Sequence, residues 1–159
     1  MSPEVEREIE STYRRTLIIT TSVGVSILVI LVLNVFLVGR GLGISIRDYR
    51  TLRIAITVTV LFLALGSILL RRYMFNSMKM EIVRATGGIK GMLQHLSKTS
   101  VLLSAITEAA AILGLVFGII TGDSAFATSL ILVGLAVFTV GFPRRSSWLR
   151  AVAVAEATS

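Results

Sequence analysis

The chain has 159 residues, of which 54% are hydrophobic, with a mean hydropathy of +0.85 and a formal net charge of +7. A soluble domain of this length needs more polar side chains on its surface, so the composition indicates an integral membrane protein. The absence of cysteine excludes disulfides, thiolate metal sites and catalytic thiols. The basic residues cluster at the ends of the apolar segments, so we interpret them as topology signals and lipid contacts and expect no nucleic-acid binding.

Four apolar segments divide the sequence, at about residues 16–38, 52–71, 100–121 and 124–142. Each is close to the roughly 20 residues that a helix needs to cross about 30 Å of hydrocarbon. We therefore predict an all-α fold, an integral membrane four-helix bundle, in a single membrane domain covering residues 1–159.

The first helix is expected to be unusually long. Ser2 can cap it, Pro3 suits the first helical position, and no breaker precedes the apolar segment, so one helix from Pro3 to about Val38 is predicted. The glutamates before this segment and its length argue against a cleaved signal peptide, and we expect it to remain as an anchor. Glycines then end the helix, at Gly39, Gly41 and Gly43. A capping-box-type motif, Ser45-Ile-Arg-Asp48, places the start of the second helix near Ile46.

The longest polar stretch, residues 71–99, is predicted to be a cytoplasmic amphipathic segment. Gly87-Gly88 is expected to break it, and four apolar residues after the break share one helical face, namely Ile89, Met92, Leu93 and Leu96. Three interpretations fit: a short helix lying on the bilayer, a cytoplasmic extension of the third span, or a docking helix for a partner protein. The only histidine of the sequence, His95, is expected to lie at the surface.

The third and fourth spans must form an antiparallel hairpin, because only the short link at residues 121–124 separates them. Asp123 is placed to cap the fourth helix. Phe142-Pro143 is expected to end that helix, and Trp148 suits the membrane interface.

The distribution of Lys and Arg predicts the topology. With four spans, twelve of the sixteen lie on the side that holds both termini and residues 71–99. The positive-inside rule therefore places both termini in the cytoplasm of a multi-pass inner (plasma) membrane protein. Seven residues are expected to mark the membrane surface: Arg14, Arg15, Arg71, Arg72, Arg144, Arg145 and Trp148.

Glu108 is the most informative residue, because it lies inside the apolar run 101–120. At about nine residues from the cytoplasmic end of its helix it would be roughly 13 Å deep. A carboxyl at this depth needs a partner, a proton, a water-filled cavity or an ion. Ser104 lies one turn earlier, nearly on the same helical face, so the two residues together form a hypothetical ion-binding site.

Small residues recur every four positions on a different face of the same helix, at Ala110, Gly114, Gly118 and Gly122. Such a stripe allows another helix to approach closely, and we predict that these residues mediate helix packing. Glu108 points away from Ala110 on a helical wheel, so the third helix has one smooth face and one that carries a carboxyl.

Three roles for Glu108 are consistent with the sequence. A protonated carboxyl can form a structural hydrogen bond between helices. It can also be a reversible proton or cation site. The third possibility is an ion pair with an arginine of another chain, or contact with a cofactor. Asn34, the other polar residue deep in a span, lies near the outer end of the first helix, where a packing or helix-end hydrogen bond is expected.

The segment Glu108-Ala-Ala-Ala-Ile-Leu-Gly-Leu-Val116 resembles the carboxylate helix of rotary ATP synthase subunit c. In that family a Glu followed by small residues and a Gly-Leu step binds the translocated proton or Na⁺, so the resemblance implies an ion-binding role for Glu108. The chain lacks the family's Gly-rich partner helix and its Arg-Gln-Pro loop and has two extra spans, so a rotor ring is not implied. The overall layout also resembles small uncharacterised bacterial four-helix integral membrane proteins, a resemblance that implies architecture and no activity.

The sequence contains no Ser-His-Asp set, P-loop, zinc motif or paired acidic cluster, so we expect no catalytic site, no metal site, no cofactor and no enzymatic activity. The leading hypothesis is a small accessory or structural subunit of a larger membrane protein complex. The alternatives are a proton- or cation-translocating component that uses Glu108, and a binder of lipid or a small apolar ligand. Expected partners are membrane lipids and either other membrane subunits or further copies of the chain.

Overall fold

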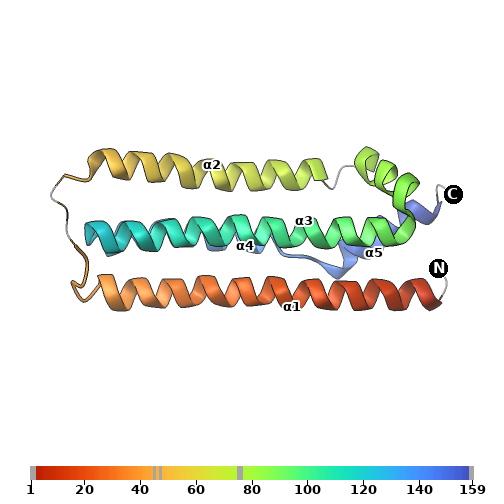
Figure 1. Ribbon diagram of the computed structural model, residues 1–159, viewed down its shortest axis with the longest axis horizontal. Coiled ribbons are helices and arrows are strands. Elements are labelled where there is room, and N and C mark those ends of the chain that lie inside the picture. The colour runs from red at the N-terminus through yellow and green to blue at the C-terminus, as the bar shows by residue number, and fades with distance from the viewer. Residues whose placement is uncertain (1–2, 45, 47, 75–76, 158–159) are drawn as a thin grey trace.

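The computed structural model describes residues 3–44, 46, 48–74 and 77–157, and over these residues it contains helices and short connections without a strand. In chain order the elements are α1 (Pro3–Leu33), the π-helical segment η1 (Asn34–Val38), α2 (Arg50–Met74), α3 (Ser77–Thr121), α4 (Ser124–Gly141) and α5 (Arg145–Ala157). Figure 1 shows α1, α2 and α3 side by side, and α3 is central because it packs against α1, α2 and α4.

Four of these helices are long and apolar enough to cross a membrane, and they agree with the four predicted segments. They are Glu4–Val38, Arg50–Met74, Ala85–Thr121 and Ser124–Gly141. The all-helical fold is thereby confirmed for the described residues, and four helices of spanning length and apolarity support a multi-pass membrane protein.

The predicted long first helix is confirmed. Helix α1 passes directly into η1, in which the Gly39 N–H donates to the Asn34 carbonyl at 3.3 Å, five residues back. The buried side chains of this helix mostly recur at intervals of three or four, which makes one continuous stripe facing α3 and α4. They are Ile9, Thr16, Thr20, Ile27, Ile30, Asn34 and Val38. Gly41, with φ 77°, then redirects the chain.

Helix α2 begins at Arg50, later than the predicted start near Ile46. The Asp48 carboxylate accepts from the Arg50 N–H at 3.5 Å, while Ser45 and Arg47 of the predicted capping motif lie outside the described residues. The preceding residues cross the end of α3, where the Ile44 N–H donates to the Ile119 carbonyl at 2.8 Å. The backbone between α1 and α2 thus provides a donor for a carbonyl in the last turn of α3, which has no partner within its own helix. The chain is held at α3 by this bond, and α2 starts later.

The predicted break at Gly87-Gly88 is present as a kink within α3, where Gly88 has φ 62° and ψ −160°. The part of α3 before Gly88 turns away from the rest of the helix (Figure 1). After the kink α3 is straight into its span, so the amphipathic segment is the extension of the third span and not a separate surface helix.

The apolar face of this extension is covered by the chain itself. It packs with the start of α1 and with α5 in a membrane-proximal cluster, whose buried members are Ile9, Met92, Leu93, Leu96, Trp148 and Val152. A helix lying on the bilayer would keep these side chains toward lipid. Here the apolar side chains face α1 and α5 in place of lipid, because α1 extends beyond its span alongside α3.

Two predicted surface residues are instead enclosed by this packing. Trp148, expected at the membrane interface, is only 1% exposed and meets Tyr13 edge-to-face at 5.5 Å between ring centroids. His95 is half-buried, with Nε2 at 3.3 Å from the Met74 carbonyl oxygen at the end of α2. The burial of Trp148 arises because the chain returns after Pro143 as α5, which places Trp148 against α1 and α3, whereas His95 is partly covered by the end of α2.

The α3–α4 hairpin forms as predicted. Gly122 has φ 74°, and its N–H donates to the Gly118 carbonyl at 2.8 Å, which ends α3 in an αL motif. The Asp123 carboxylate caps α4 by accepting from the Phe126 N–H at 3.0 Å. Helix α4 ends at Gly141, immediately before Phe142-Pro143.

Candidate functional site

The small-residue stripe of α3 packs against α4 of the same chain. A Cβ added to Gly114 would lie 2.9 Å from Ile131 Cγ1, and one added to Gly118 would lie 2.9 Å from Ala127 Cβ. Ala110 is buried with Val60 and Leu130 in a small apolar cluster. Gly122 completes the spacing but serves the helix end, where the Cα of Gly122 touches Gly43. The stripe is therefore used within the chain, and its face is occupied.

Glu108 lies on the α1 side of α3, away from the stripe as predicted. It is half-buried, and the Ser26 hydroxyl on α1 donates to its Oε1 at 2.5 Å. The contact joins two spans at membrane depth, where a polar group without a partner would be expensive. The sequence did not single out Ser26, although its place at the centre of the first span was a usable signal.

Ser104 is not joined to Glu108. Its side chain is buried, and its hydroxyl donates to the Ser100 carbonyl at 2.9 Å within α3. With Thr107 it lines a cavity among α2, α3 and α4. The two residues of the hypothetical ion-binding site thus have separate hydrogen-bond partners, Ser26 for Glu108 and the Ser100 carbonyl for Ser104.

Asn34, the first residue of η1, forms hydrogen bonds to α4. Its Nδ2 donates to Thr128 Oγ1 at 2.9 Å and to the Ser124 carbonyl at 3.2 Å, and the side chain is fully buried. Its Oδ1 lies against Gly118, where an added Cβ would be 2.6 Å away. The predicted packing and helix-end role of Asn34 is confirmed.

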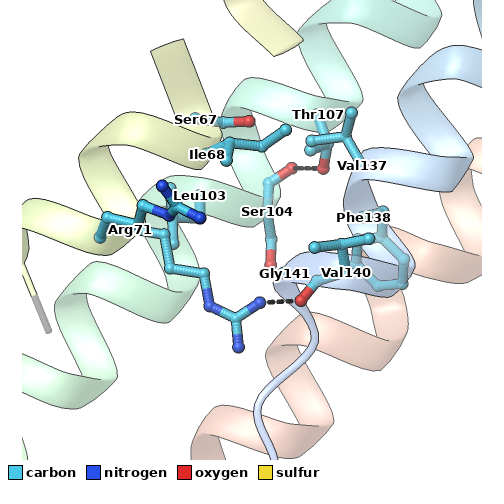
Figure 2. A pocket seen from close by; sticks show the side chains of 11 residues that line it. Ser67, Ile68, Arg71, Leu103, Ser104, Thr107, Val137, Phe138, Val140 and Gly141 are labelled. Carbon is cyan, nitrogen blue, oxygen red and sulfur yellow. Dashed lines mark hydrogen bonds between the residues drawn. The ribbon is translucent and has the colours of Figure 1, made fainter. Parts of the chain in front are cut away.

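A cavity of about 440 Å³ lies among α2, α3 and α4 near the end of the spans that carries Arg71. Figure 2 shows the Arg71 side chain extending to α4, where its guanidinium donates to the Val140 carbonyl. The lining residues combine hydroxyls, arginines and apolar side chains, and they are Ser67, Ile68, Arg71, Arg72, Leu103, Ser104, Thr107, Val137, Phe138, Val140 and Gly141. Sequence inspection missed this cavity.

The other predicted surface arginines have different surroundings. Arg14, Arg15, Arg72 and Arg144 are exposed. Arg145 pairs with Glu10 of α1 at 3.1 Å, with both side chains more than half exposed. An ion pair this exposed is worth little by itself, but it joins α5 to α1 at the edge of the membrane-proximal cluster.

Comparisons with protein-family models, with curated proteins and with solved structures found no match to this chain.

Proposed function

We propose that the chain is a small structural subunit of a larger membrane assembly, built as a four-helix bundle that lies in the inner (plasma) membrane with both termini in the cytoplasm. In this proposal the protein has no enzymatic role. It associates through its transmembrane helices with other membrane subunits or with further copies of itself.

The observation that carries the proposal is the half-exposed Glu108 carboxyl. Its hydrogen bond to Ser26 satisfies one oxygen position, and the remainder of the group opens onto an otherwise apolar face between α1 and α3. An acceptor at membrane depth is stabilised by a further donor. A helix of another subunit that supplies this donor would bury the carboxyl and make the contact specific.

The surface beside Glu108 suits such a helix. Ala105 and Ala109 lie next to it on the exposed face of α3, four residues apart, with the exposed Ile112 one turn further on. Small side chains at this spacing let a second backbone come close enough for van der Waals packing and interhelical hydrogen bonds. The glycine stripe is occupied by α4, whereas this second small-residue face is exposed and open to a partner.

The topology follows the charge distribution. The membrane-proximal cluster lies at the end of the spans that carries Arg14, Arg15, Arg71, Arg72 and Arg144. The positive-inside rule assigns this end to the cytoplasm. Cysteine substituted at Ser2 and at the exposed Leu42, each tested with a membrane-impermeant thiol reagent in intact cells, checks it: only the Leu42 variant should react.

The assembly is tested by extraction of the full-length chain from native membranes in mild detergent or nanodiscs, followed by mass spectrometry. Stoichiometric partner proteins or a defined homo-oligomer are expected. Glu108→Gln retains an acceptor and a donor and should leave the assembly intact. Glu108→Leu should release the partner, whereas Ser129→Leu, at an exposed position of α4 away from this face, should not. A lone monomer under every extraction condition would contradict the proposal.

A second candidate function, proton translocation through Glu108, is favoured by the hydroxyl that lies 2.5 Å from the carboxyl on a face that is partly accessible. Proton transfer requires this kind of adjacent donor and acceptor. The resemblance to subunit c supports the same role. Proton flux into vesicles that is abolished in Glu108→Gln, together with carbodiimide labelling of Glu108, would favour this candidate over the structural one, because the structural role tolerates Gln.

A further inference from the structure

The cavity among α2, α3 and α4 has an amphipathic lining that Glu108 and the proposed assembly do not use. One end carries Arg71 and Arg72, and the other end lies deeper in the spans at Thr107. Its volume of about 440 Å³ falls within the range of about 300–1,000 Å³ that is usual for small-molecule sites.

Positive charge is concentrated at the mouth of this cavity. Arg71 is half-buried and held across the opening by its bond to the Val140 carbonyl, while Arg72 beside it is exposed (Figure 2 shows Arg71). Arg144, just after α4, is close enough for its charge to repel that of Arg71. Like charges held this close are stabilised by an anion placed between them, and guanidinium groups match the geometry of phosphate oxygens.

The remainder of the lining is apolar or already hydrogen-bonded. The Ser67, Ser104 and Thr107 hydroxyls donate to carbonyls of their own helices, to Ala64, Ser100 and Ser104 respectively. Their oxygens can therefore accept a hydrogen bond from a ligand hydroxyl. Between them lie five apolar side chains, those of Ile68, Leu103, Val137, Phe138 and Val140. This wall continues from the arginines toward the interior of the spans.

We propose that the cavity binds one anionic phospholipid, with its phosphate at Arg71 and Arg72 and the beginning of an acyl chain along the apolar wall. The position of the site favours this ligand over a water-soluble one. Its arginines lie near the end of the α2 span, the depth at which lipid phosphates are found, and its apolar wall lies where acyl chains begin. The proposal is independent of the proposed function, because it uses neither Glu108 nor the face beside it.

The test is native mass spectrometry of the full-length chain in detergent, titrated with phosphatidylglycerol and with phosphatidylcholine of identical acyl chains. We expect phosphatidylglycerol to bind about tenfold more tightly. Both lipids offer the same phosphate, but the choline ammonium of phosphatidylcholine is repelled by Arg71 and Arg72, whereas phosphatidylglycerol carries a net negative charge. Arg71→Gln should reduce this preference to less than about threefold. Arg15→Gln removes an exposed arginine of α1 that is remote from the cavity and should retain the full preference.

A second variant keeps the test decisive if Arg71→Gln fails to fold. Ile68 lines the cavity but is 38% exposed, so Ile68→Trp narrows the site with little effect on the core, and it should weaken both lipids. Equal binding of the two lipids by the unmodified chain would overturn the proposal. So would equal losses in Arg71→Gln and Arg15→Gln, which would show only general surface attraction. Glycerol 3-phosphate is the third ligand: if it binds as tightly as phosphatidylglycerol, the site takes a soluble phosphate and the lipid proposal is wrong.

Discussion

On the side of α3 that faces α4, glycines bring the two backbones so close that an added Cβ at Gly114 would lie 2.9 Å from Ile131. On the side that faces α2, the three helices α2, α3 and α4 leave a cavity of about 440 Å³. Helix α2 buries only Val60 and Ser67 among its 25 residues. The same central helix thus has one close-packed neighbour and one loosely packed neighbour.

The difference shows how packing replaces the hydrophobic effect inside a membrane. Lipid tails are as apolar as Leu or Ile, so burial of an apolar side chain against another helix gains little transfer free energy there. Helices associate tightly where small residues allow many van der Waals contacts and where polar groups pair, and α4 has both in Gly114, Gly118 and the Asn34–Thr128 bond. Helix α2 has few such contacts, which leaves room at this interface for a ligand.

The largest expected effect comes from a cavity made on the close-packed side. Ile131→Ala removes a side chain that is 0% exposed and that lies against Gly114 and the apolar cluster around Ile27. We expect the free energy of unfolding to fall by about 2–3 kcal/mol, since closely approaching backbones cannot collapse into the space. The measurement is reversible unfolding in mixed micelles, followed by circular dichroism. Ile68→Ala on the cavity side is the control, with an expected loss below about 1 kcal/mol; equal losses would remove the distinction between the two sides.

A smaller effect is expected from overpacking. Gly118→Ala places a methyl group 2.6 Å from Asn34 Oδ1 and 2.9 Å from Ala127 Cβ. The Asn34 side chain must move and strain its bonds to α4, at a cost of about 1–2 kcal/mol. Gly66 on α2 has nothing within 4 Å of an added Cβ, so Gly66→Ala should leave stability unchanged or raise it by about 0.5–1 kcal/mol. The prediction fails if both variants change the unfolding midpoint in the same direction.

Much of the fold could be predicted because its determinants are local in the sequence. Apolar segments of span length, the Asp123 cap and the Pro143 stop act within a few residues of where they occur, and each is found in the structure. The direction of Glu108 away from Ala110 followed from helical geometry alone. The start of α2 could not be predicted in this way, because a hydrogen bond from Ile44 to α3 delays it.

The partners of the site residues depended on information that periodicity does not contain. A helical wheel gives the face on which Glu108 lies but not which helix covers it, so the bond to Ser26, 82 residues away in sequence, was missed. The burial of Trp148 likewise depends on α5 turning back against α1 and α3. The cavity is formed by imperfect contact among three helices, and a single sequence contains no direct signal for such a gap.

The smallest expected effect separates a hydrogen bond between helices from one within a helix. Thr128→Val removes the hydroxyl that accepts from Asn34 Nδ2 at 2.9 Å while it keeps the side-chain shape. Interhelical polar contacts in membranes contribute about 0.6 kcal/mol on average, and a loss of about 0.6–1 kcal/mol is expected because Nδ2 retains the Ser124 carbonyl. Ser67→Ala on the cavity side removes a hydroxyl whose bond, to the Ala64 carbonyl at 2.8 Å, stays within α2. Its effect should be below about 0.5 kcal/mol, because the carbonyl keeps its helical partner. If Ser67→Ala costs as much as Thr128→Val, the hydroxyls on both sides of α3 contribute equally. The greater stability of the close-packed side would then come from van der Waals contact alone.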